Sequence, residues 1–155
     1  MDHARGLRST AIVLGLAAAM AASLQAQMSP ARPGQRDFIV DEANLIRPED
    51  RDQIKQVCET LLKEQSTPIV VVTIPSLAKY GGVDIDSYAL ALFNRWGIGS
   101  QLNSDGILLL VSVGDRKARI ELGEGYAHTR DETARMIMQE IIVPNFKKGD
   151  YSAGI

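Results

Sequence analysis

Residues 69–74 read Ile-Val-Val-Val-Thr-Ile and are followed at once by Pro75. A short run this rich in β-branched apolar side chains is typical of a central strand that is covered on both faces. Proline suits the end of such a strand because it has no N–H to donate to a neighbouring strand. The stretch therefore predicts a buried strand in the middle of a sheet, with helices on either side of it.

A helix is expected before this strand. Pro48, Glu49 and Asp50 make a suitable first helical turn, because the proline N–H would have no helical partner there and acids suit the dipole. The apolar residues that follow recur at helical spacing and mark one face: Ile54, Val57, Cys58, Leu61 and Leu62. Cys58 is the only cysteine, so it is predicted to lie in the core and cannot form an intramolecular disulfide.

A second helix is expected after the strand, from Asp84 as its N-cap to Gly97 as its left-handed C-terminal residue. Its inner stripe is Ile85, Tyr88, Ala89, Leu92, Phe93 and Trp96. Downstream, the apolar run 106–113, the Gly114-Asp115 pair and the alternating residues 116–122 predict a β-hairpin. A third helix is expected from about Asp131, disturbed by Pro144, with an inner face of Ala134, Ile137, Met138, Ile141 and Ile142.

Taken in order, these elements predict an α/β fold: a mixed β-sheet of about four strands sandwiched between helices (αβα), with a C-terminal β-hairpin. The length of 155 residues suits one such domain. The charge is nearly balanced, with 17 basic and 19 acidic residues, so no field of one sign exists to hold a polyanion. Nucleic acid is therefore not expected as a partner.

The N-terminus predicts export. Arg5 and Arg8 precede an apolar run from about residue 10 to 22, and small residues over 23–26 offer a cleavage site near Ala26. Residues 1–26 are therefore interpreted as a signal peptide, 27–37 as a flexible linker and 38–155 as the folded domain, located in the periplasm or cell envelope. An uncleaved membrane anchor is the less favoured alternative, because the run is shorter than the ~20 residues that span a bilayer.

From residue 38 onward, the chain carries short segments whose order and spacing are characteristic as a set. They are Val40-Asp41-Glu42-Ala43, 69–72, 93–99, Asp105-Gly106-Ile107-Leu108-Leu109, 116–121, Gly123-Glu124-Gly125, 142–146 and 149–155. Together they resemble the TPM domain, often called TPM phosphatase, of bacterial envelope proteins, plant thylakoid-lumen proteins and an animal receptor modulator. The resemblance covers the whole predicted domain.

The resemblance implies an αβα sandwich with a small acidic pocket that holds calcium or another divalent cation in some members. Acid phosphatase activity is claimed for some members, and others resemble assembly or repair factors of membrane complexes. Two features depart from the family. Ala127 and His128 stand where many members carry a glutamate, and the sequence stops at Ile155, where members usually continue into a closing helix. The domain is thus expected either to be shortened or to leave a sheet face uncovered.

The hairpin itself predicts a pair of facing carboxylates. A two-residue turn at Gly114-Asp115 would place Leu108 opposite Glu121 and Asp105 opposite Glu124. Like charges in these positions repel unless solvent screens them or a cation lies between them, and a hard divalent ion such as calcium suits oxygen ligands. The resemblance places Asp41 in the same region, and Asp131 begins the following helix.

The candidate metal ligands are therefore Asp41, Asp105, Glu124 and Asp131. The alternative is that Asp105 is a turn residue and Asp131 a helix cap, both solvated.

Other chemical signatures are weak. The sequence has no nucleophile elbow, no phosphate-binding Gly-Lys loop and no His or Cys pair with zinc spacing. His128 is interpreted as a surface residue, residues 123–125 as a turn rather than an anion nest, and Lys117 and Arg119 as solvated protection of the sheet edge. No catalytic residue is therefore assigned.

Two functional classes are open. The favoured one is a non-catalytic envelope module that assists the assembly, repair or maintenance of a membrane-protein complex, which it contacts through the hairpin edge or an uncovered surface. The alternative is a metal-assisted acid phosphatase acting on phosphomonoesters, in which Asp41, Asp105 and Glu124 hold the ion.

Overall fold

The computed structural model describes residues 29–34, 37–99, 104–126 and 128–155. The chain divides into two units, 1–30 and 31–155, and the second unit holds the sheet and the helices that cover it. The expected signal peptide, the linker residues 27–28 and 35–36, and Ala127 lie outside the described residues. Within the described ranges, no helix is both long enough and apolar enough to cross a bilayer.

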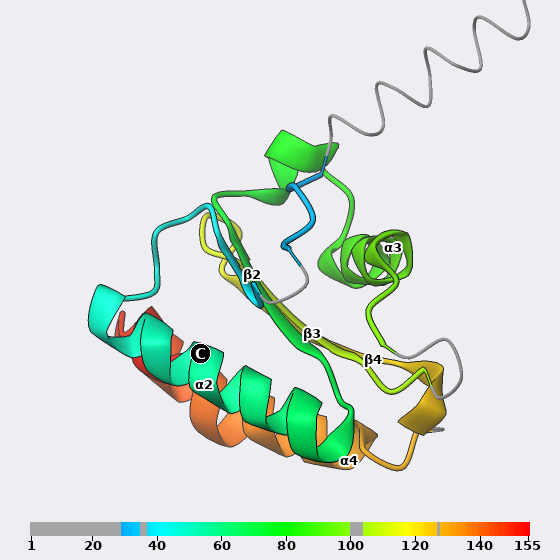
Figure 1. Ribbon diagram of the computed structural model, residues 1–155. Coiled ribbons are helices and arrows are strands. Elements are labelled where there is room, and N and C mark those ends of the chain that lie inside the picture. The colour runs from blue at the N-terminus through cyan, green and yellow to red at the C-terminus, as the bar shows by residue number, and fades with distance from the viewer. Residues whose placement is uncertain (1–28, 35–36, 100–103, 127) are drawn as a thin grey trace, which may run out of the picture. The chain divides into compact units, whose positions relative to one another are not determined.

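A four-stranded mixed sheet with the order β1-β2-β3-β4 forms the middle layer (Figure 1). The first three strands are parallel to one another, and β4 is antiparallel to β3: β1 (Ile39–Asp41), β2 (Ile69–Ile74), β3 (Ile107–Ser112) and β4 (Lys117–Leu122). Helix α3 (Ile85–Trp96) covers one face, while α2 (Pro48–Gln65) and α4 (Asp131–Ile137) cover the other. The predicted αβα sandwich is confirmed.

Shorter elements connect these parts. They are the 3-10 turns η1 (Leu77–Tyr80) and η2 (Glu124–Tyr126), the π-helical stretch η3 (Met138–Ile142), and helices α5 (Val143–Lys147) and α6 (Tyr151–Gly154). The π-helical stretch accounts for the disturbance expected at Pro144. A wider i→i+5 turn interrupts the helix, and the proline then falls in the first turn of α5, where its missing N–H costs nothing.

Successive residues of β2 and β3 point into two separate cores. Val70, Val72 and Ile74 pack with Leu108 and Leu110 against the stripe of α3, all of whose predicted inner residues are buried. Val71 packs with Leu109 and Val111 against Cys58 of α2 and Ile142 of η3. The central strand is thus covered on both faces, as its composition predicted.

The apolar face of α2 is narrower than expected. Cys58 is 2% exposed, and Ile54 packs beside it, but Val57 is 51% exposed and Leu62 is exposed as well. The helix contacts the sheet along the line of Cys58, and Val57 and Leu62 lie on opposite sides of that line. The helical period was predicted correctly, but the width of the buried stripe was not.

The hairpin has the predicted register, with Leu108 opposite Glu121 and Ser112 opposite Lys117. Its turn differs in detail, because Arg116 adopts a left-handed conformation with φ 54° beside the Gly114-Asp115 pair. Gly114 is required by a close approach: a Cβ there would lie 2.6 Å from the carbonyl oxygen of Pro75. The hairpin turn therefore packs directly on the end of β2.

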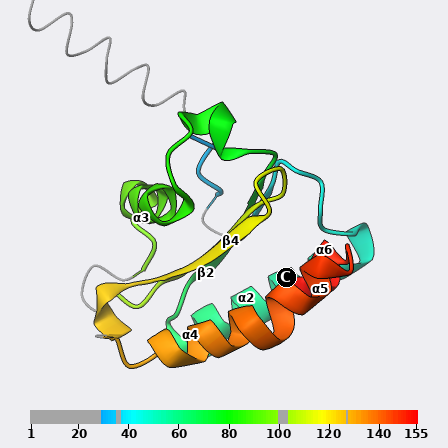
Figure 2. The same cartoon turned by 180° about the vertical axis from the view of Figure 1, so that it is seen from behind.

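β4 lies at the edge of the sheet, between α3 and α4 (Figure 2). The Gly123 N–H donates to the Gly106 oxygen, and the Ile107 N–H donates away from β4, to the Pro68 oxygen. Because hydrogen-bonded and non-bonded pairs alternate along an antiparallel ladder, the backbone groups of Lys117, Arg119 and Glu121 face β3. Those of Ala118, Ile120 and Leu122 face outward.

This assignment predicts that proline destabilises one of two neighbouring positions much more than the other. We expect Ala118→Pro to change the free energy of unfolding by less than about 1 kcal/mol, because only an outward N–H is lost. Arg119→Pro should cost about 1–3 kcal/mol more than Arg119→Ala, because it removes a ladder bond to β3. Chemical denaturation of the variants measures both effects, and equal losses at both positions would show that the ladder assignment is wrong.

Burial also governs the single thiol. Burial raises the pKa of Cys58 to about 11. We expect it to react roughly 100-fold more slowly with a thiol reagent in native than in denatured protein, because little thiolate is present. The protonated thiol stabilises the fold fully below its ordinary pKa, and this contribution declines as the pH rises toward 11. Labelling at the same rate with and without denaturant would contradict the buried position.

Candidate functional site

Asp41 is the last residue of β1, and its carboxylate accepts hydrogen bonds from the turn that follows and from β2. The Oδ1 atom accepts hydrogen bonds from the Leu45 N–H at 2.9 Å and from the Thr73 hydroxyl, and Oδ2 accepts from the Ile46 N–H at 3.1 Å. The carboxylate thereby ties the turn after β1 to β2. In the structure, Asp41 acts as a cap for this turn.

Asp105 and Glu124 lie at the opposite end of the sheet. Beyond Ile107 and Leu122, the last paired residues of the hairpin, the Gly123 N–H donates to the Gly106 oxygen and the Gly125 N–H to the Ser104 oxygen. These bonds hold together the backbone on either side of Asp105 and Glu124, but Glu124 already begins the turn η2, so the facing of the two carboxylates stays a prediction. The same bonds occupy both glycine N–H groups, so residues 123–125 form a turn rather than an anion nest.

Asp131 begins α4 and contacts His128. Its Oδ2 lies 2.7 Å from Nδ1 of His128, whose side chain is 92% exposed. His128 has φ 66°, a left-handed conformation in the loop that leads into α4. Both residues lie at the same end of the sheet as Glu124, and all three line one groove.

The structure does not bring the four predicted ligands into one site. Asp41 is aligned with Thr73 and thereby with Val111, six residues beyond Asp105 in a parallel strand, a distance of about 20 Å along the sheet. Among the described residues, no group of three or more His, Cys, Asp or Glu side chains is arranged to hold a metal ion. Calcium binding by the Asp105–Glu124 pair stays a prediction.

The carboxyl ends of the parallel strands, a common ligand site in open α/β sheets, are occupied by local contacts. Asp115 accepts hydrogen bonds from the Ser112 hydroxyl at 2.6 Å and from the Leu77 N–H at 2.7 Å. Both bonds hold the pKa of Asp115 below its ordinary value, and the bond from Ser112 has the larger effect. Together with Asp41, this carboxylate stabilises loops rather than a ligand cradle.

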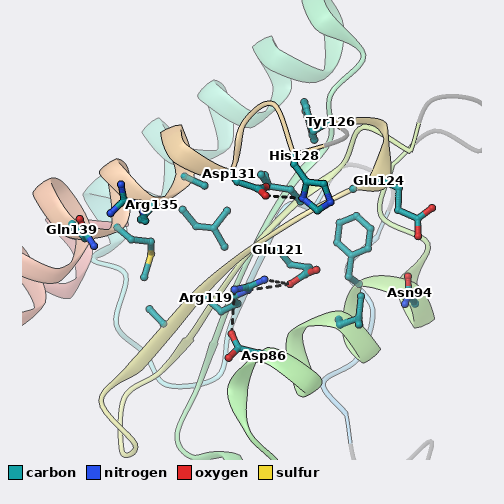
Figure 3. Close-up of a pocket in the computed structure, with 18 residues that line it drawn as sticks. Asp86, Asn94, Arg119, Glu121, Glu124, Tyr126, His128, Asp131, Arg135 and Gln139 are labelled. Atoms are coloured by element: carbon teal, nitrogen blue, oxygen red, sulfur yellow. Dashed lines mark hydrogen bonds and ion pairs between the residues drawn. The ribbon is translucent and has the colours of Figure 1, made fainter.

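The main groove lies instead along the free edge of β4 and has a volume of about 850 Å³. Residues 118–122 of β4 form its floor, and α3 and the α4–η3 segment form its walls (Figure 3). The α3 wall contributes Asp86, Leu90, Phe93 and Asn94, and the opposite wall Asp131, Ala134, Arg135, Met138 and Gln139. The groove therefore offers a strand edge flanked by apolar and charged side chains.

Arg119 organises the charges on the α3 side of this groove. Its guanidinium lies 3.2 Å from Asp86 of α3 and 3.1 Å from Glu121 of β4 (Figure 3). Arg119 lies at the sheet edge with 43% of its side chain exposed, as expected, and it also bridges the edge strand to α3. Sequence reasoning missed Asp86, and its only signal was an acid in the first turn of a helix, which the dipole alone explains.

The fold and this edge groove define a three-layer α/β domain, and comparison with known proteins identifies its family. The family described as the TPM domain matches residues 39–155. The chain belongs to the TPM domain family. No curated protein matches it.

Solved structures share the fold. An N-terminal domain from P. gingivalis has 24% identity and a TM-score of 0.67, with 84% of this chain and 79% of that chain covered. The N-terminal domain of the cg2496 protein from Corynebacterium glutamicum has 14% identity and a TM-score of 0.61, covering 81% and 77%. The BA42 protein from Bizionia argentinensis has 20% identity and a TM-score of 0.56, covering 72% and 74%.

The contacts of Asp41 predict a loss of stability that does not depend on calcium. We expect Asp41→Ala to lower the free energy of unfolding by about 2 kcal/mol, because two N–H groups and a hydroxyl lose their acceptor. The loss should be equal in calcium and in chelator. Glu124→Ala, at an exposed carboxylate, should stay within about 0.5 kcal/mol in chelator.

The same melts test the calcium prediction at Asp105 and Glu124. If the Asp105–Glu124 pair binds calcium, the ion should raise the melting temperature of the wild type and of Asp41→Ala, but not that of Asp105→Asn. A calcium response that depends on Asp41 would contradict the role of a local cap.

Proposed function

We propose that this chain is an exported, non-catalytic interaction module of the cell envelope that assists the assembly, repair or maintenance of a membrane-protein complex. It does so by pairing its β4 edge with an extended segment of another polypeptide. The observation that carries the proposal is the position of β4, whose outward backbone groups lie on the floor of the groove. Strand addition to a free edge is a common mode of peptide recognition, in which the backbone supplies affinity.

The walls of the groove suit a strand with alternating side chains. The α3 side offers Arg119 and Glu121, while Ala134 and Met138 line the other side. A bound segment would therefore place charged residues toward α3 and apolar residues toward α4, because successive side chains of a strand point to opposite faces. Such alternation supplies specificity for one register.

The proposed location rests on the N-terminal pattern. A signal peptide cleaved near Ala26 would release the domain into the periplasm or envelope, with the following linker residues free to give it reach.

The alternative function is a metal-assisted acid phosphatase acting on phosphomonoesters. The backbone bonds that hold the segments around Asp105 and Glu124 together support this alternative, because a divalent cation would relieve repulsion between two carboxylates brought close there. Asp41 lies too far along the sheet to share that ion. Turnover of a generic phosphate ester by protein loaded with a divalent metal, abolished by Asp105→Asn, would place the alternative ahead of the interaction module.

Site-specific crosslinking in exporting cells tests the interaction module. A photoreactive residue in place of Leu90, on the α3 wall of the groove, should crosslink to a membrane protein, whereas one in place of the exposed Val57 on α2 should not. Adding Ala118→Pro should remove the crosslink because it deletes an outward N–H of the edge. Ala118→Ser, which keeps that N–H, should preserve it.

Crosslinks that form equally from Leu90 and Val57, or that survive Ala118→Pro, would show that the edge is not the docking surface.

A further inference from the structure

We propose that, when no other strand occupies it, the β4 edge pairs with the β4 edge of a second copy of this chain, doubling the sheet across a two-fold axis at Ile120. This inference rests on the proposed function, since it takes the same edge to be a strand-binding site and names the strand that fills it. The occupant follows from the backbone and side-chain pattern of β4 itself.

The backbone of β4 is in the correct phase for this pairing. Its outward-facing groups belong to Ala118, Ile120 and Leu122. An antiparallel copy centred on Ile120 places Ala118 opposite Leu122 of the second copy and Ile120 opposite its own counterpart. All three pairs fall at hydrogen-bonded positions, so each can exchange both N–H···O bonds.

The charges of β4 are complementary to themselves in the same register. Between the apolar pairs, Arg119 lies opposite Glu121 of the second copy, and the two-fold axis repeats this contact. A small residue meets a large one where Ala118 faces Leu122. A strand shift by one residue would move the apolar side chains to the wrong face, and a shift by two, which moves the axis to Arg119 or Glu121, would place like charges opposite one another. The register centred on Ile120 is therefore favoured.

An apolar residue on the helix beside the free edge would be covered by such pairing. Leu90 lines the α3 wall of the groove and is 49% exposed. The two-fold axis brings the α3 helices to the same face of the doubled sheet, where the Leu90 side chains can pack together. Pairing would also remove the unpaired edge, which otherwise invites uncontrolled association.

Two opposite charge variants of the 155-residue chain test the register by sedimentation velocity. The wild type should be a dimer. Arg119→Glu and Glu121→Arg should each raise the dimer dissociation constant about tenfold or more, because each places two like-charge pairs across the axis. An equimolar mixture of the two variants should restore the dimer. In that mixed dimer, the glutamate introduced at position 119 faces the arginine introduced at position 121, and the unchanged Arg119 faces the unchanged Glu121.

The mixture also answers whether either variant has simply misfolded, because only folded edges can restore the dimer. Lys55→Glu, a charge reversal of an exposed residue on α2, is the matched control and should leave the dimer unchanged. Ala118→Pro should weaken the dimer while leaving the free energy of unfolding of the monomer within about 1 kcal/mol of the wild type.

A wild type that is monomeric at its highest soluble concentration would overturn the proposal, as would a dimer that is unaffected by the charge variants. A monomer that still crosslinks to a membrane protein through Leu90 would retain the proposed function and remove only the second copy as an occupant. A dimer that shows no edge-dependent crosslink to a membrane protein would retain the second copy as the occupant and overturn the proposed function.

Discussion

The strict alternation of side chains along β2 and β3 is the constraint on which the rest of the structure depends. Each strand gives every second residue to the core beneath α3 and the others to the core beneath α2 and η3. Because both faces are buried, neither strand can shift by one residue without moving its whole apolar set to the wrong core. The positions of the helices and the register of the hairpin follow from this arrangement.

The same constraint leaves β4 with a different character. The side chains of Ala118 and Ile120 join the core on the α2 face, while Arg119 and Glu121 lie on the α3 face and form ion pairs. The strand is therefore held firmly on its inner side and open on its outer side. A rigid edge is a better recognition surface than a mobile loop, because little conformational entropy is lost when a partner binds.

Local pattern predicted most of the fold. The composition of 69–74, the caps of α3 at Asp84 and Gly97, and the hairpin register each depend on residues close together in sequence, and the structure confirms them. The exposure of Val57 could not be predicted, because helical period does not say how much of an apolar face a neighbouring element covers.

The candidate site was harder to predict because it depends on distant contacts. The donors that occupy Asp41 include Thr73, and the ion pair of Arg119 uses Asp86 on another element. The separation of Asp41 from Asp105 does have a sequence signal: one residue ends a strand and the other precedes a parallel strand. Since parallel strands run in the same direction, such residues lie at opposite ends of the sheet.

The placement of α2 and α3 on opposite faces has a consequence for chirality. The strands β1, β2 and β3 are adjacent in chain order and parallel, so both connections advance in the same direction across the sheet. If one connection passes over the front and the other over the back, the two must have opposite hands, and one is left-handed. Strand twist strongly favours the right-handed form. Local twist alone therefore cannot direct both helices, and the left-handed connection must be selected by the apolar stripe that its helix buries.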